Sequence, residues 1–188
     1  MKRIISICLV MIFVLGFVAC NGEGQDGLLS DDLNSLMFQL DGVIYTFPVH
    51  FSELEENGWE AYDPDGYFAD EALGAAEFDV WELRNGEQNI SKAFTNLTEG
   101  ELAMSESYIT GFAVLAGLHS AQVVLPGNIT IGSTYEDVMD AYGDILRHIW
   151  EYENFTRFLF DAALLSLTVS IDIETNQVIL LHINFHRN

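Results

Sequence analysis

The sequence predicts an α+β fold with two diverged units, each a short helix packed on an antiparallel β-sheet. Alternating apolar residues on both sides of Asp-Gly and Asn-Gly dipeptides are typical of β-hairpins. Each half of the chain also contains one short run bounded by helix-capping residues. The order of strand, proline, helix, glycine and further strands occurs in both halves, which indicates a tandem duplication with about 70 residues per unit.

The first unit, predicted over residues 36–118, begins with a β-hairpin. Apolar residues alternate on both sides of Asp41-Gly42, a dipeptide that supplies the positive φ of a tight turn. Asn85-Gly86 predicts a second hairpin in the same way. Further strands of this unit are expected at 59–62, 90–97 and 108–115.

Each unit is predicted to contain one capped helix. In the first unit, Ser52 and Glu55 have the spacing of a capping box, and in the second unit Ser133 and Glu136 have it. The second helix has the clearer pattern, with apolar residues at i, i+3, i+4 and i+7 followed by a glycine: Tyr135, Val138, Met139, Tyr142 and Gly143.

The second unit is predicted over residues 119–188 and contains mostly strands. Its expected strands lie at 121–125, 145–150, 155–160, 164–173 and 178–185. With one helix and several antiparallel strands, it should fold as a helix on one face of a sheet.

The charge balance excludes one class of function. The 188 residues include 7 Lys and Arg against 29 Asp and Glu, a net charge of −22. Such a chain has no basic patch with which to displace the counterions of nucleic acid, so a nucleic-acid partner is not expected.

The first residues predict export. Lys2 and Arg3 precede an apolar run over 4–19, which is short for a membrane span and has the length of a signal-peptide core. The run stops at Cys20, and Phe17-Val18-Ala19-Cys20 resembles the lipobox of bacterial lipoproteins. This resemblance implies a signal peptide over 1–19, cleavage before Cys20 and lipidation of its thiol with acyl chains such as palmitate.

Cysteine usage and charge agree with a lipid anchor. The only other cysteine, Cys8, lies inside the predicted signal peptide, so the mature chain could form no internal disulfide. Cleavage would remove two basic side chains and no acid, which leaves 5 basic against 29 acidic residues and a net charge of −24. Anionic lipid headgroups repel such a surface. We therefore expect an extracytoplasmic protein at the bacterial cell membrane, held by its lipid through a tether over 20–35.

Two other segments resemble a known family. Residues 129–138, which end a few positions before Tyr142-Gly143, resemble the helix signature of bacterial lipoproteins of the beta-lactamase-inhibitor-protein-like type, including the small outer-membrane-assembly lipoproteins. Residues 171–178 resemble the hairpin with which these units finish. The resemblance implies tandem helix-on-sheet units and a binding role. It carries over no functional residue.

Neither the histidines nor the acidic turns have the spacing that predicts a metal site. His182 and His186 lie two pleats apart on an alternating strand, with only Asn184 between them, so polar residues on an exposed strand face are the better interpretation. Asp63-Pro64-Asp65-Gly66 has the composition of a calcium loop, but not the ligand order of an EF-hand. We predict no metal and no cofactor, and calcium at this turn stays an open alternative.

Acidic pairs and aromatic residues were the remaining candidates for chemistry. The pairs Glu55/Glu56 and Glu136/Asp137 are predicted to lie in N-terminal helical turns, where they complement the helix dipole without a catalytic role. The aromatic residues Trp59, Trp81, Trp150, Tyr62 and Tyr67 are expected to be mostly core, with one exposed pair as a binding platform.

Two functions from different classes follow. The first is a membrane-anchored, non-catalytic module that binds a protein or envelope ligand on an exposed sheet face. The alternative is a hydrolase of envelope polymer, which requires two carboxylates facing one cleft, one of them with a raised pKa. No catalytic motif is present, so the sequence predicts no catalytic residue and favours the binding module.

Overall fold

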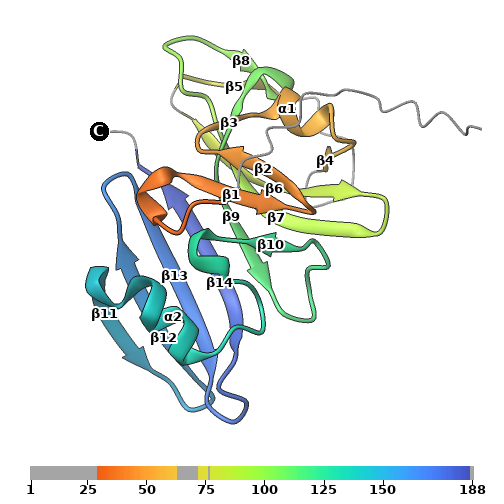
Figure 1. Ribbon diagram of the computed structural model, residues 1–188. Helices are drawn as coiled ribbons and strands as arrows, with labels where there is room; N and C mark the ends of the chain where they lie inside the picture. The colour runs from red at the N-terminus through yellow and green to blue at the C-terminus, as the bar shows by residue number, and fades with distance from the viewer. Residues whose placement is uncertain (1–28, 63–71, 76, 187–188) are drawn as a thin grey trace, which may run out of the picture.

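One large antiparallel sheet organises the molecule (Figure 1). The computed structural model describes residues 29–62, 72–75 and 77–186. Within these ranges, nine strands form a single sheet. In spatial order they are β11 (Leu146–Glu151), β12 (Phe155–Asp161), β13 (Leu165–Asp172), β14 (Val178–Phe185), β9 (Tyr108–Leu115), β7 (Gln88–Thr95), β6 (Phe78–Asn85) and β4 (Glu60–Tyr62), with β3 (Val49–His50) also pairing with β9.

A second layer covers one face of this sheet. It contains a three-stranded sheet and two α-helices, which lie in front of the long strands in Figure 1. The small sheet is β10 (Val123–Val124), β1 (Met37–Leu40) and β2 (Val43–Thr46), and the helices are α1 (Phe51–Glu55) and α2 (Tyr135–Tyr142). The remaining elements are the β5 (Ala72–Leu73) and β8 (Leu102–Ala103) pair and the 3-10 turns η1 (Leu33–Ser35), η2 (Met104–Glu106), η3 (Pro126–Asn128) and η4 (Gly143–Ile145).

Aromatic contacts show which side chains of the large sheet face this layer. Phe112 of β9 lies 5.0 Å from Phe38 of the small sheet, between ring centroids. Phe94 of β7 lies 5.0 Å from Phe51 of α1, and Phe158 of β12 lies 5.6 Å from Tyr135 of α2. The hydrophobic core therefore fills the space between the two layers. We call the opposite side of the large sheet, which neither helix nor the small sheet covers, the open face.

The predicted α+β fold class is wrong. Strands hold 51% of the described residues and helical turns only 17%, so the fold is mostly β. The first predicted helix, α1, has five residues, and the longest helix of the described residues is α2, which runs on into η4. The predicted units are also not separate helix-on-sheet layers. β14 hydrogen-bonds to β9 across the predicted boundary at residue 118, and this pairing merges the strands of both halves into one sheet.

The predicted helix caps are displaced. The start of α1 is capped by the His50 side chain, which accepts from the Ser52 backbone N–H, and not by Ser52 itself. In α2 the capping box is formed by Thr134 and Asp137, one residue later than predicted. The predicted extent of α2 is correct, because its apolar face fixes it: Val138 and Tyr142 are fully buried.

Both predicted hairpins are confirmed. β1 and β2 pair across Asp41-Gly42, where φ is +47° and +88°. β6 and β7 pair as far as Asn85 and Gln88. Of the predicted strands, 121–125 is the poorest match, because only Val123–Val124 forms a strand there.

The amino-terminal predictions lie mostly outside the described residues. The signal peptide over 1–19, Cys20 and the first part of the tether over 20–35 are among them. Of the described tether residues, Leu33 in η1 is only 2% exposed, so packing begins before residue 36. No described helix has both the length and the apolar character that a membrane crossing requires.

Lys92 is the unexpected member of the core. Its position on β7 between Ile90 and Phe94 turns it toward the covering layer, where it is 1% exposed. Its Nζ lies 4.6 Å from the centre of the Phe94 ring and has no hydrogen-bond partner. Burial holds the pKa of Lys92 well below its usual value. The contact with the ring offsets only part of the lost hydration.

We predict that Lys92→Met stabilises the protein, by about 1–3 kcal/mol at pH 7, because it removes an unpaired buried polar group while it keeps the volume. The pKa of Lys92 is lower in the folded than in the unfolded chain, so wild-type stability should rise as the pH increases from the folded pKa toward 10.5. Urea unfolding at pH 7 and 9.5 measures both effects. The gap between variant and wild type should narrow at pH 9.5, and a less stable variant contradicts this account.

Candidate functional site: the open face of the sheet

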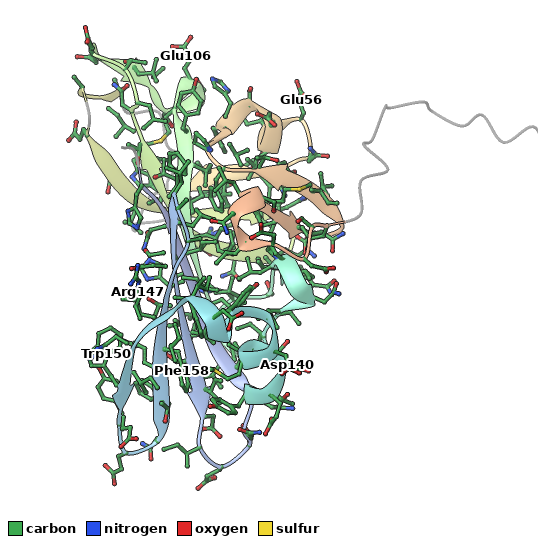
Figure 2. The ribbon with its side chains drawn as sticks, turned by 60° about the vertical axis from the view of Figure 1, so that its left-hand side comes forward. Glu56, Glu106, Asp140, Arg147, Trp150 and Phe158 are labelled. Carbon is green, nitrogen blue, oxygen red and sulfur yellow. The ribbon has the colours of Figure 1, made fainter. Side chains whose placement is uncertain are left out.

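Three rows of side chains cross the open face, because alternate residues of each strand point to it. The pairing registers place them opposite one another. One row contains Trp150, Arg157, Ser170, Leu180 and Leu115. The next contains His148, Leu159, Thr168, His182, Ala113, Ser91 and Glu82, and the third contains Asp161, Ser166, Asn184, Gly111, Ala93 and Val80. In Figure 2, Trp150 lies on the opposite side of the sheet from Asp140 of α2.

The open face is hollowed at its centre. A first hollow of about 430 Å³ lies over β7, β9 and β14, between Val80, Thr95 and Asn184. A second hollow of about 390 Å³ extends from Ala113 to Trp150 and Tyr152. Ala113 and His182 line both, so the two are continuous. A third, of about 130 Å³, adjoins the second at Arg157 and Leu180. The two larger volumes lie within the range of small-ligand sites, roughly 300–1,000 Å³.

Small residues make room for the first hollow. Gly111 and Ala113 of β9 lie where the strands of the two halves meet, and Ala93 of β7 lies beside Gly111. A Cβ on Gly111 would lie 2.7 Å from the carbonyl oxygen of Ile183 and 2.7 Å from Oδ1 of Asn184. The close approach of β14 to β9 therefore requires glycine at this position. Because Gly111 has no side chain, it also leaves space for the first hollow.

No described residue that lines these three hollows is acidic, although 29 of the 188 residues are Asp or Glu. Three acids near the open face lie outside these hollows, and each has a bonded partner. Glu82 pairs with Arg84 at 2.9 Å, and this hydrogen bond lowers the pKa of Glu82. Asp161 lies 3.4 Å from Arg147. Asp172 accepts two hydrogen bonds from Thr175.

Arg157 lies at the centre of the second hollow without a carboxylate partner in the described part of the chain. Its Nε donates to Oγ of Ser170 at 3.3 Å. Its Cζ lies 5.6 Å from the Tyr152 ring centre and 5.5 Å from the Phe155 ring centre, and those two rings stack at 4.5 Å. These contacts position the guanidinium group and leave its charge uncompensated.

His182 connects the first two hollows. Its Nε2 lies 3.1 Å from the side-chain nitrogen of Asn184. Burial lowers the pKa of His182, and the charge of Arg157 lowers it further. The imidazole is therefore neutral at pH 7 and can accept or donate one hydrogen bond on each nitrogen. The cationic residues of the lining are Arg157 in the second hollow and Lys92 in the first, and the Lys92 ammonium group points away from the hollow, onto the Phe94 ring.

The sequence-derived candidates are distributed over several places. His182 lies in the site, whereas His186 lies beyond the end of β14 and bonds to Ser166 at 2.9 Å. Trp59 and Trp81 are core residues, as predicted, at 2% and 4% exposure. Trp150 is 38% exposed and lines the second hollow together with Tyr152, a residue that was not among the aromatic candidates of the sequence.

The remaining candidates lie away from the open face. The calcium-loop candidate Asp63-Pro64-Asp65-Gly66 and Tyr67 lie outside the described residues. Glu55 and Glu56 are solvent-exposed at the end of α1, Glu136 accepts from Asn176, and Asp137 is the helix cap. No described group of three His, Cys, Asp or Glu side chains could hold a metal ion.

The acids required by the hydrolase hypothesis do not meet on the open face. A separate shallow hollow beside α2 is lined by Asp31, Asp137 and Asp140. Asp137 there is engaged by the backbone and side chain of Thr134, which lower its pKa instead of raising it. No observation among the described residues favours paired acid and base catalysis.

Comparison with known proteins finds no matching family model, no similar curated protein and no similar solved structure. The resemblance of residues 129–138 to the beta-lactamase-inhibitor-protein-like lipoproteins therefore stays a prediction from that motif.

We predict that Gly111→Ala lowers the free energy of unfolding by about 1–3 kcal/mol, because the added methyl group would force β14 away from β9. Gly100→Ala is the matched control, since nothing lies within 4 Å of its Cβ position. That variant should be unchanged or more stable by up to about 1 kcal/mol. Thermal and urea unfolding measure both. A Gly111→Ala protein as stable as wild type would show that the close approach is not a constraint.

Proposed function

We propose that the protein is a non-catalytic binding protein that captures a small ligand in the hollows of its open face. The observation that carries the proposal is the chemistry of these hollows. In a chain with a net charge of −22, the concave surface formed by the three hollows has no acid among its described lining residues. It presents Arg157, which has no carboxylate partner in the described part of the chain, whereas the other lining cation, Lys92, is buried.

The shape and composition of the hollows favour a small ligand and not the flat surface of a partner protein. The hollows are concave, and they combine small residues, hydroxyl groups and exposed aromatic rings, as ligand sites do. We further propose that the protein works outside the cytoplasm and is held at the membrane by acyl chains on Cys20. The signal-peptide pattern and the strongly acidic body support this location.

Trp150 provides a reporter of ligand binding, because it lines the second hollow while Trp59 and Trp81 are buried. We predict that a ligand found by screening the full chain against defined oligosaccharides and short peptides changes the tryptophan emission. Trp150→Phe should abolish that change. Binding to the surface without any response of Trp150 contradicts the proposed site.

We predict that Ala113→Arg abolishes binding, because the new side chain would fill the junction of the first and second hollows. Ala103→Arg is the control, since Ala103 is exposed on β8, outside the hollows. Titration with the ligand found in the screen measures both variants, and circular dichroism checks that Ala113→Arg is folded. Undiminished binding by folded Ala113→Arg would exclude the open face.

The anchor gives a separate prediction. Mass spectrometry of the membrane fraction should find acyl chains on an N-terminal Cys20, and Cys20→Ala should remove both the acyl mass and the lipoprotein-type cleavage. An intact Met1 without acyl mass, or an unmodified N-terminus beyond Cys20, would contradict the lipid anchor.

A further inference from the structure

We infer that the ligand of the open face is an acidic saccharide, whose carboxylate pairs with Arg157 while its sugar ring lies against Trp150 and Tyr152. This inference rests on the proposed function and specifies its ligand. Three features of the site support it: its charge, its aromatic rings and its hydrogen-bonding groups.

The charge of the site selects an anion. Each of the other described arginines has a carboxylate partner: Arg84 has Glu82 and Arg147 has Asp161. Arg157 has only the hydroxyl of Ser170 and the faces of two rings, so its outward N–H groups remain available. A carboxylate matches the planar fork of a guanidinium group in a bidentate pair. The surrounding acidic surface would repel a long polyanion, so a short oligosaccharide with few carboxylates fits best.

The exposed aromatic rings of the second hollow favour a ligand that contains a sugar ring. Trp150 is directly opposite Arg157 in the β11–β12 register and is 38% exposed, and Tyr152 is 45% exposed. Both line the same hollow as Arg157. An exposed aromatic face beside a fixed cation offers apolar contact to the C–H groups of a sugar ring and a charge partner to its acid group.

The polar groups select hydroxyls. Thr168 and neutral His182 line the second hollow, and Ser91, Thr95 and Asn184 line the first. These groups both donate and accept, as a hydroxyl-bearing ring requires, and they extend the site beyond one ring. The two continuous hollows could therefore hold adjacent sugar units of one chain.

The test uses trigalacturonic acid and its trimethyl ester, in which a methyl group on each carboxyl group removes the negative charge. Titration calorimetry with the full chain should detect binding of the acid. The affinity for the ester should be lower by about tenfold or more. Arg157→Gln should weaken binding of the acid by about 10- to 100-fold and leave the ester unaffected. Arg147→Gln removes the same charge from an arginine that already has a partner, and it should bind like wild type. Trialanine and its amide test a peptide carboxylate.

The outcomes separate this inference from the proposed function. Equal binding of acid and ester, both lost in Ala113→Arg, overturns the acidic ligand and retains the open face as a binding surface. Trialanine binding with no binding of trigalacturonic acid overturns the saccharide. No binding of the acid at millimolar concentration also overturns it. Binding of the acid that survives both Ala113→Arg and Arg157→Gln overturns the inference and the proposed function together.

Discussion

The pairing of β14 with β9 is the constraint on which the rest of the structure depends. Five residue pairs, from Leu180 opposite Leu115 to Asn184 opposite Gly111, join strands that are separated by more than sixty positions in the sequence. This contact turns two sets of hairpins into one sheet and lets one continuous core form beneath it. It also places the small residues Gly111 and Ala113 at the middle of the opposite face, where they line the first hollow. The same contact thus creates the core and the site.

The distribution of charge gives the open face its chemical character. Acidic side chains keep the surface soluble, but an acid inside the hollows would repel an anionic ligand and would neutralise Arg157. The acids near this face lie outside the hollows. Glu82 pairs with Arg84, Asp161 pairs with Arg147, and Asp172 accepts a hydrogen bond from Thr175 in the turn after β13. Arg157 instead contacts rings, which orient it without cancelling its charge. Arg157 can therefore attract an anionic ligand to the second hollow, although the net negative charge of the rest of the protein repels anions.

Local signals in the sequence predicted local structure well. The hairpin at Asp41-Gly42, the helix over Tyr135–Tyr142 and the strand over Val178–Phe185 depend on turn chemistry and periodicity within a few residues. The pairing of β14 with β9 has no such signal, since both strands alternate and many partners would fit. The fold class was wrong for that reason, and because the capping residues around Ser52 start a helix of only five residues.

The site was predictable only in part. The strand pattern predicted that one sheet face would be exposed, and Trp150 on that face was among the aromatic candidates. Arg157 was not selected, because a single arginine on an alternating strand is normally a solvated surface residue. Its distinction is the lack of a carboxylate partner, and this depends on the register that sets Trp150 and Ser170 on either side of it. Likewise, only the core packing shows that Lys92 faces inward.

The central claim, that the open face is the binding surface, is tested most directly by methyl NMR of the full chain titrated with trigalacturonic acid. Ala113 and Leu180 line the hollows, whereas Val138 and Val169 are fully buried on the covered side of the sheet. The account predicts saturable shifts of the Ala113 and Leu180 methyl groups and none at Val138 and Val169. Shifts confined to α2 or to the small sheet, with Ala113 unchanged, would contradict it.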